Sequence, residues 1–145
     1  MANTSRINGF KPVKHLNGSP YNGQFNLYEV AAADATAIFV GDLVRMQAGT
    51  GTEGLETVSV VATTEQTTGS GLVGAVVGFQ MPNSTVQGSL SAGALSIDTP
   101  VYRAALTKRL VMVADSPDLV FEVQDGGTVP CTNALIGSNT GYTIG

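Results

Sequence analysis

The sequence contains no tryptophan, one cysteine and one histidine. A single cysteine, Cys131, cannot form a disulfide within the chain or a multi-cysteine zinc site. The only histidine, His15, cannot build a His-based metal site unless several subunits contribute to it. We therefore expect no metal and no cofactor.

Charged residues are also scarce, at 12% of the chain against 43% hydrophobic residues. Soluble domains usually have about 25% charged residues. The few Lys and Glu residues leave little material for solvent-facing helices, so a helical bundle is disfavoured. A chain of 145 residues with so little charge is expected to bury part of its surface against other molecules.

Long hydrophobic runs are missing as well. The longest one, Leu72–Phe79, contains two glycines, and a membrane-spanning helix needs about 20 apolar residues. The polar N-terminus has no apolar segment typical of a signal peptide. We expect synthesis in the cytoplasm and no membrane partner.

The charges that are present are unevenly distributed. Residues 1–24 contain Arg6, Lys11 and Lys14 and no acid, whereas residues 25–145 have a net charge of −7. Three separated cations are too few for a nucleic-acid interface, and the acidic body would repel DNA. The pattern indicates a basic arm that lies on an acidic surface, its own or a neighbour's, or else a frayed terminus without a function.

The arm is expected to be extended. Three Asn-Gly pairs, together with Pro12 and Pro20, break any helix in residues 1–24. Phe10, Val13 and Tyr21 are the apolar side chains that this arm could dock.

The remaining sequence predicts short β-strands between turns that the 18 Gly and six Pro residues favour. The expected strands are Gln24–Val30, Leu43–Met46, Val58–Ala62, Leu72–Phe79, Pro100–Ala105, Leu110–Ala114 and Leu119–Gln124. We expect the last two to form a hairpin around Asp115–Asp118. The predicted fold is all-β, a small Gly-rich β-barrel or β-sandwich over residues 25–145, with residues 1–24 as an extended N-terminal arm.

The expected core consists of apolar residues in these strands: Phe25, Leu27, Val44, Val58, Val60, Val76, Phe79, Leu110, Val111, Phe121 and Val123.

No sequence motif strongly indicates nucleotide binding or catalysis. Gly69–Gly74 matches G-x-G-x-x-G, but the valines, glycines and proline that follow are poor helix formers, so a Gly-rich loop is favoured. His15, the only imidazole, lies in the flexible-looking arm, which positions a general base poorly, and Cys131 is better interpreted as a small buried apolar residue. Asp115 and Asp118 are typical of a turn. The sequence therefore indicates a structural or binding protein and not an enzyme.

Several phrases of the sequence are similar to the capsid decoration, or cement, proteins of tailed bacteriophages. They are Gly9-Phe10, Pro12-Val13, Gly18–Gly23, Phe39–Val44, Gly74–Phe79 and Val113–Gln124. The resemblance implies a β-rich virion protein on the outer surface of the head, which binds as a trimer or dimer and clamps neighbouring capsomers. The major capsid protein is then the expected partner, and the expected contact residues of the arm are Arg6, Phe10, Lys11, Val13, Lys14 and Tyr21.

Other functions remain open at this point. The chain could be another part of the virion, such as a head–tail connector or a tail- or fibre-associated β module. A module that binds glycans or the host surface is a further alternative, although the absence of tryptophan disfavours it.

Overall fold

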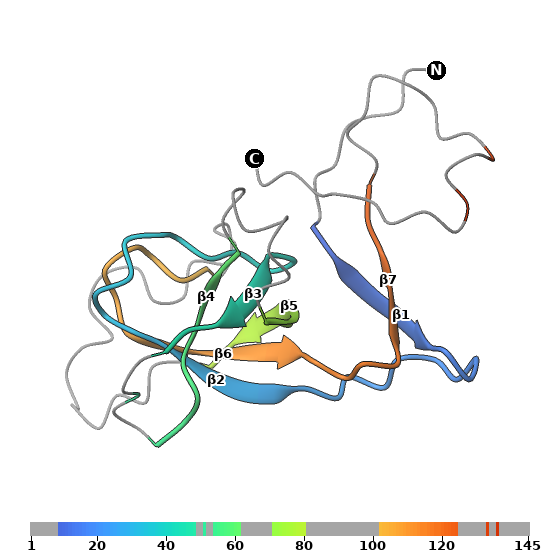
Figure 1. The fold of residues 1–145 in the computed structure, drawn as a ribbon, viewed down its shortest axis with the longest axis horizontal. Helices are drawn as coiled ribbons and strands as arrows, with labels where there is room; N and C mark the ends of the chain where they lie inside the picture. The colour runs from blue at the N-terminus through green and yellow to red at the C-terminus, as the bar shows by residue number, and fades with distance from the viewer. Residues whose placement is uncertain are drawn as a thin grey trace.

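The computed structural model describes residues 9–48, 51, 54–61, 71–80, 102–124, 133 and 136. Its regular elements are all β-strands, which confirms the all-β prediction (Figure 1). They are β1 (Lys11–His15), β2 (Asn26–Val30), β3 (Leu43–Met46), β4 (Val58–Val60), β5 (Leu72–Phe79), β6 (Arg109–Ala114) and β7 (Leu119–Glu122). In this part of the chain, no helix has the length and hydropathy needed to cross a membrane.

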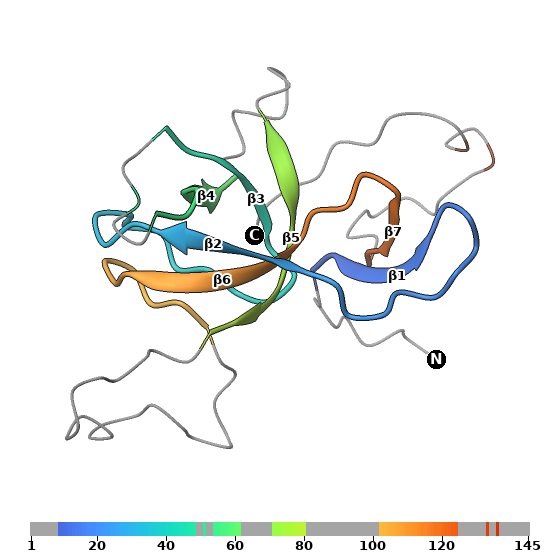
Figure 2. The same cartoon turned by 90° about the horizontal axis from the view of Figure 1, so that it is seen from below.

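Five strands form a small barrel. They are hydrogen-bonded in the order β2-β6-β5-β3-β4, and all neighbouring pairs are antiparallel. The ring closes where β4 meets β2, through a parallel bridge between Glu29 and Thr57 and a 2.9 Å hydrogen bond from Glu29 N–H to the carbonyl of Glu56. Figure 2 shows these strands arranged around a common centre.

The barrel interior contains mostly β-branched side chains, as expected for positions that alternate on pleated strands. The buried set is Tyr28, Val30, Ile38, Val44, Val58, Val76, Phe79, Val111 and Val113. Tight contact between β5 and β6 depends on Gly74, where a Cβ atom would collide with the carbonyl of Ala114.

The core prediction is only partly correct. Its confirmed members are Val44, Val58, Val76, Phe79 and Val111. Leu27, Val60, Leu110 and Phe121 are half-buried. Phe25 and Val123 are exposed, so their assignment to the core is wrong: Phe25 precedes β2 on the same outward side as Leu27, and Val123 follows the end of β7.

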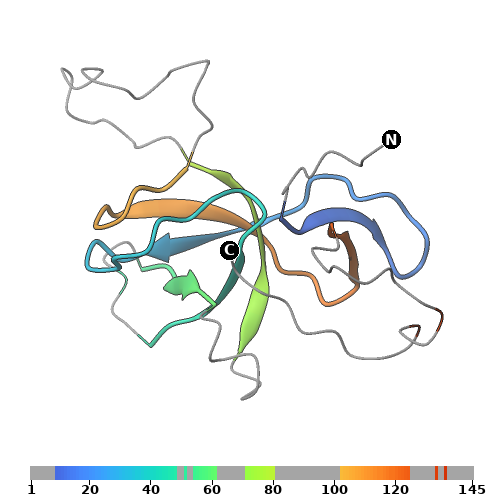
Figure 3. The same ribbon diagram turned by 90° about the horizontal axis from the view of Figure 1, so that it is seen from above.

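A second sheet consists of β1 and β7 alone, paired antiparallel from Lys11↔Glu122 to His15↔Leu119. It lies beside the barrel in all three ribbon views (Figures 1, 2 and 3). Phe10 and Phe121 attach it to a second apolar cluster formed by Leu43, Val61 and Ala75. Since Val44 and Val76 point into the barrel, Leu43 and Ala75 point outward, so the two-stranded sheet packs on the outer face of the barrel.

The predicted hairpin of Leu110–Ala114 and Leu119–Gln124 is wrong. β6 pairs with β2 and β5, whereas β7 pairs with β1 in the other sheet. The turn residues change the direction of the chain, but they carry it out of the barrel instead of folding it back.

The other strand boundaries follow the prediction closely. Leu43–Met46 and Leu72–Phe79 are confirmed, and β2 starts two residues later than expected. Pro100–Ala105 is not a strand in its described part, where only Arg103 forms an isolated bridge with Ile38. Pro100 and Val101 lie outside the described residues.

Candidate functional site

The predicted binding residues of the arm fall into an exposed group and an inward-facing group. Lys11, Val13 and Lys14 are exposed on β1, with Val13 at 41%. Arg6 lies outside the described residues. Leu16, which the sequence analysis did not single out, is 72% exposed directly after β1. We call Lys11, Val13, Lys14 and Leu16 the arm surface.

The backbone of the arm surface is fixed on both sides. On one side β1 pairs with β7, with a register shift between Pro12 and Lys14. On the other side the chain turns back, so that Ser19 C=O accepts from His15 N–H at 2.8 Å and Val13 C=O accepts from Tyr21 N–H at 3.0 Å. The exposed side chains are therefore presented on ordered backbone and need no large rearrangement before a partner binds.

Phe10 and Tyr21 make contacts within the chain. The Phe10 ring packs edge-on against Phe121, with centroids 6.5 Å apart, and its N–H donates to Gly41 C=O at 2.8 Å. The Tyr21 hydroxyl donates to Gln24 C=O at 2.7 Å, and burial raises the pKa of Tyr21. Both residues hold the arm in place, and a contact of either with a partner stays a prediction.

Two acidic residues lie beside the arm surface, one on β7 and one directly before it. Glu122 is the cross-strand partner of Lys11, and Asp118 accepts a 2.8 Å hydrogen bond from Leu16 N–H through its backbone carbonyl. Both acids are exposed. The basic arm thus lies beside acidic residues of its own chain, one of the two arrangements that the charge pattern indicated.

One carboxylate fixes the start of the segment that leads from β6 to the small sheet. Asp115 accepts from the Tyr28 hydroxyl at 2.6 Å and from the Asn26 amide at 2.9 and 3.1 Å. Burial, followed by this hydrogen bond and the charge of Asp115, raises the pKa of Tyr28. The sequence placed Asp115 in a turn, and its partners could not be predicted because they lie 87 and 89 residues away.

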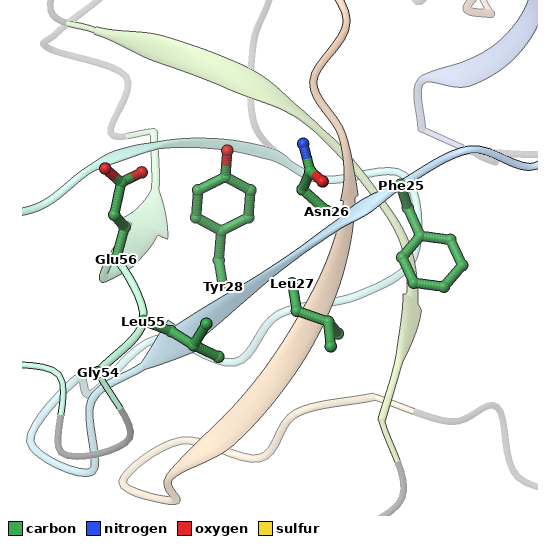
Figure 4. Close-up of a pocket in the computed structure, with 7 residues that line it drawn as sticks. All are labelled: Phe25, Asn26, Leu27, Tyr28, Gly54, Leu55 and Glu56. Atoms are coloured by element: carbon green, nitrogen blue, oxygen red, sulfur yellow. The ribbon is translucent and has the colours of Figure 1, made fainter.

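A shallow groove of about 550 Å³ runs along β2 (Figure 4). Its lining residues are Phe25, Asn26, Leu27, Tyr28, Gly54, Leu55 and Glu56. Leu27 and Leu55 lie on one side of the strand in the close-up, and the polar ends of Tyr28 and Glu56 lie on the other. The described lining contains no histidine, cysteine, serine or basic side chain.

Arg103 is a buried structural centre that the sequence analysis did not identify. Its side chain is fully buried and donates to the carbonyls of Thr107, Thr36, Ala31 and Asp34. Asp34 Oδ1 lies 3.7 Å from its Nη1 atom. Burial lowers the pKa of Arg103. The sequence around Arg103 was predicted to be a short strand, and nothing in it indicates a buried arginine that bonds four carbonyls.

Among the residues that the structure describes, no group of three or more His, Cys, Asp or Glu side chains could hold a metal ion. His15 is half-buried in β1, and Cys131 lies outside the described part. Comparisons of the chain with protein-family models, curated proteins and solved structures gave no match.

Proposed function

We propose that this chain is a non-enzymatic decoration protein, which binds the outer surface of a tailed-phage head and clamps neighbouring capsomers. The major capsid protein is the partner, and the arm surface makes the contact. The chain is made in the host cytoplasm and binds as a homo-trimer, with a dimer as the alternative.

The observation that carries this proposal is the exposed, ordered arm surface. Val13 and Leu16 offer apolar area at 41% and 72% exposure, and Lys11 and Lys14 of the same segment are exposed as well. Interfaces commonly combine apolar contact residues with polar groups at the rim. The small sheet stands beside the barrel, so a partner can reach β1 without displacing the barrel strands (Figure 3).

The low charge of the chain further supports a role in an assembly. The arm supplies basic groups that can face acidic groups of a capsid surface, and such pairs guide association and orientation. The sequence phrases that resemble decoration proteins include Pro12-Val13 and Gly18–Gly23, which form β1 and the turn behind it.

Point substitutions test this function more cleanly than removal of the arm. Deletion of residues 1–20 would also remove β1 and Phe10, and it would uncover Leu43 and Ala75. We therefore propose to add the purified chain to heads that lack it and to measure retention by co-sedimentation, for the wild type, Val13→Asp and Lys14→Glu.

Val13→Asp is expected to weaken retention about tenfold or more, because it places a charge in the apolar part of the contact. Leu72→Asp is the matched control, since Leu72 is 56% exposed on a barrel strand outside the arm surface. Equal retention of Val13→Asp and Leu72→Asp would remove the arm surface from the mechanism. Binding to purified tails in place of heads would favour the connector or tail alternative.

A further inference from the structure

Two asparagine–glycine pairs lie in the exposed chain between β1 and β2 (Figure 2). They are Asn17-Gly18, in the turn after β1, and Asn22-Gly23, in the segment that leads to β2. All four residues are exposed, and the two glycines have positive φ, at 89° and 84°. Glycine has no Cβ to shield its nitrogen, so an asparagine before glycine is the one whose side chain is most open to attack by the next backbone nitrogen.

The nitrogen of Gly23 is available for such an attack. Within the described part of the chain its N–H has no hydrogen-bond acceptor, and no atom lies within 4 Å of where a Cβ of Gly23 would be. Gln24 N–H donates to Asn22 Oδ1 at 3.2 Å. Negative charge gathers on this oxygen when a nucleophile attacks the side-chain carbonyl carbon, so the donor stabilises the developing charge. Asn22 therefore has a polarised carbonyl next to an unbonded nitrogen.

The nitrogen of Gly18 is held within its turn instead. Its N–H donates to His15 C=O at 2.9 Å, and His15 N–H donates to Ser19 C=O at 2.8 Å. Asn17 Oδ1 accepts from the N–H and the hydroxyl of Ser19, at 2.9 and 2.7 Å, and is thus polarised as well. However, the Gly18 nitrogen can attack only after it leaves its acceptor and the turn opens. Loss of one hydrogen bond corresponds to a reaction about fivefold slower.

We propose that Asn22 is a site of spontaneous deamidation, with the Gly23 nitrogen as the nucleophile. This nitrogen loses its proton to water and forms a bond with Cγ of Asn22. The bond from Cγ to Nδ2 then breaks, and the amide group takes a proton from water and leaves as ammonia. The resulting succinimide takes up one water molecule. Opening at the side-chain carbonyl gives aspartate, whereas opening at the backbone carbonyl gives isoaspartate, whose main chain is one methylene longer.

Both products change the arm. Each adds a negative charge to residues 1–24, whose charged side chains are all basic. Isoaspartate also lengthens the chain between Tyr21 and Gln24, which are joined by the 2.7 Å hydrogen bond from the Tyr21 hydroxyl to Gln24 C=O. Tyr21 N–H donates in turn to Val13 C=O of β1. Conversion of Asn22 is therefore expected to loosen the contact between β1 and the segment that follows it.

Peptide mapping of the aged full-length chain tests this chemistry, which does not depend on phage binding. The chain is incubated in mildly alkaline buffer, folded in one sample and denatured in guanidinium chloride in another. A protease that cleaves after Tyr21 places Asn17 and Asn22 in different peptides. Mass spectrometry measures the conversion of each amide to an acid, and chromatography separates aspartate from isoaspartate peptides. Asn22→Gln is the matched variant, because it keeps the amide but would have to close a larger ring.

We expect Asn22 to convert about fivefold faster than Asn17 in the folded chain and at a similar rate in the denatured chain. Aspartate and isoaspartate should both appear at position 22, and Asn22→Gln should stay unconverted there. No conversion of Asn22 in the folded chain, equal rates at the two sites, or the same preference for Asn22 in both states would overturn the proposal. Aspartate alone at position 22 would also overturn it, because water and not Gly23 would then attack the side chain.

Discussion

The Tyr28 hydroxyl donates a 2.6 Å hydrogen bond to Asp115, and this contact connects the first strand of the barrel with the segment that leaves it for β7. Asn26 donates to the same carboxylate. Two residues of β2 therefore bond the carboxylate at the point where the chain leaves the barrel.

Tyr28→Phe tests the strength of this contact. It leaves the buried ring in place and removes a hydrogen bond to a carboxylate, so the free energy of unfolding should fall by about 1–2 kcal/mol. Tyr21→Phe is the control, because the Tyr21 hydroxyl bonds a neutral backbone carbonyl and not a carboxylate. Urea denaturation measures both, and an equal loss in the two variants would contradict a special role for Asp115.

The same tyrosine predicts a loss of stability at alkaline pH. Burial and Asp115 raise the pKa of Tyr28 above its ordinary value of 10.0, so the folded chain keeps a phenol proton that the unfolded chain releases. Stability should therefore fall as the pH rises above about 10 and continue to fall toward the folded-state pKa. Urea midpoints from about pH 8 to about pH 11 should decline less steeply in Tyr28→Phe, and identical slopes would contradict this prediction.

Arg103→Lys tests the buried arginine that joins residues 31–36 to Thr107. One ammonium group cannot replace a planar guanidinium that serves four carbonyls, and the unpaired acceptors would stay buried. We expect a loss of about 3–5 kcal/mol in the free energy of unfolding. Arg109→Lys is the comparison, because Arg109 is half-buried and lies 5.6 Å from the centre of the Phe79 ring. A loss in Arg103→Lys no larger than that in Arg109→Lys would contradict this assignment.

Phe10→Ala tests how the small sheet is attached to the barrel. The ring is half-buried between Phe121 and the outer cluster, so truncation should cost about 2 kcal/mol, less than for a fully buried phenylalanine. Val13→Ala, at an exposed position of β1, should change stability by less than about 0.5 kcal/mol.

Hydrogen exchange locates the effect of Phe10→Ala. Amides of β1 and β7 should exchange faster, and those of β5 should change less, because β5 is held between two barrel strands. Uniform acceleration in all strands would show that the small sheet does not open separately from the barrel.

Local sequence patterns predicted the strands of this fold better than their partners. The apolar run from Leu72 to Phe79 predicted β5 with its observed boundaries, because the run ends where polar and Gly/Pro-containing sequence begins. Asp115–Asp118 correctly indicated a change of direction. A turn signal is local, however, and the pairing of β7 with β1 depends on contacts between distant residues such as Phe10 and Phe121.

For the candidate site, too, the sequence predicted local features better than contacts between distant residues. Lys11, Val13 and Lys14 are exposed on β1, as charged sequence usually is, and their contact with a partner stays a prediction. Phe10 has the same apolar character as a docking residue, and only the tertiary structure shows that it contacts its own barrel. Arg103 was missed because its four carbonyl partners come from loops that no periodic pattern brings together.

The most direct test of the proposed function is the copy number of this chain relative to the major capsid protein in purified particles, measured by quantitative mass spectrometry. A protein bound throughout a symmetric capsid lattice should be present at about one third to one copy per capsid subunit. About a dozen copies per particle would contradict the decoration role and assign the chain to the connector or tail. Absence from particles would contradict any virion role.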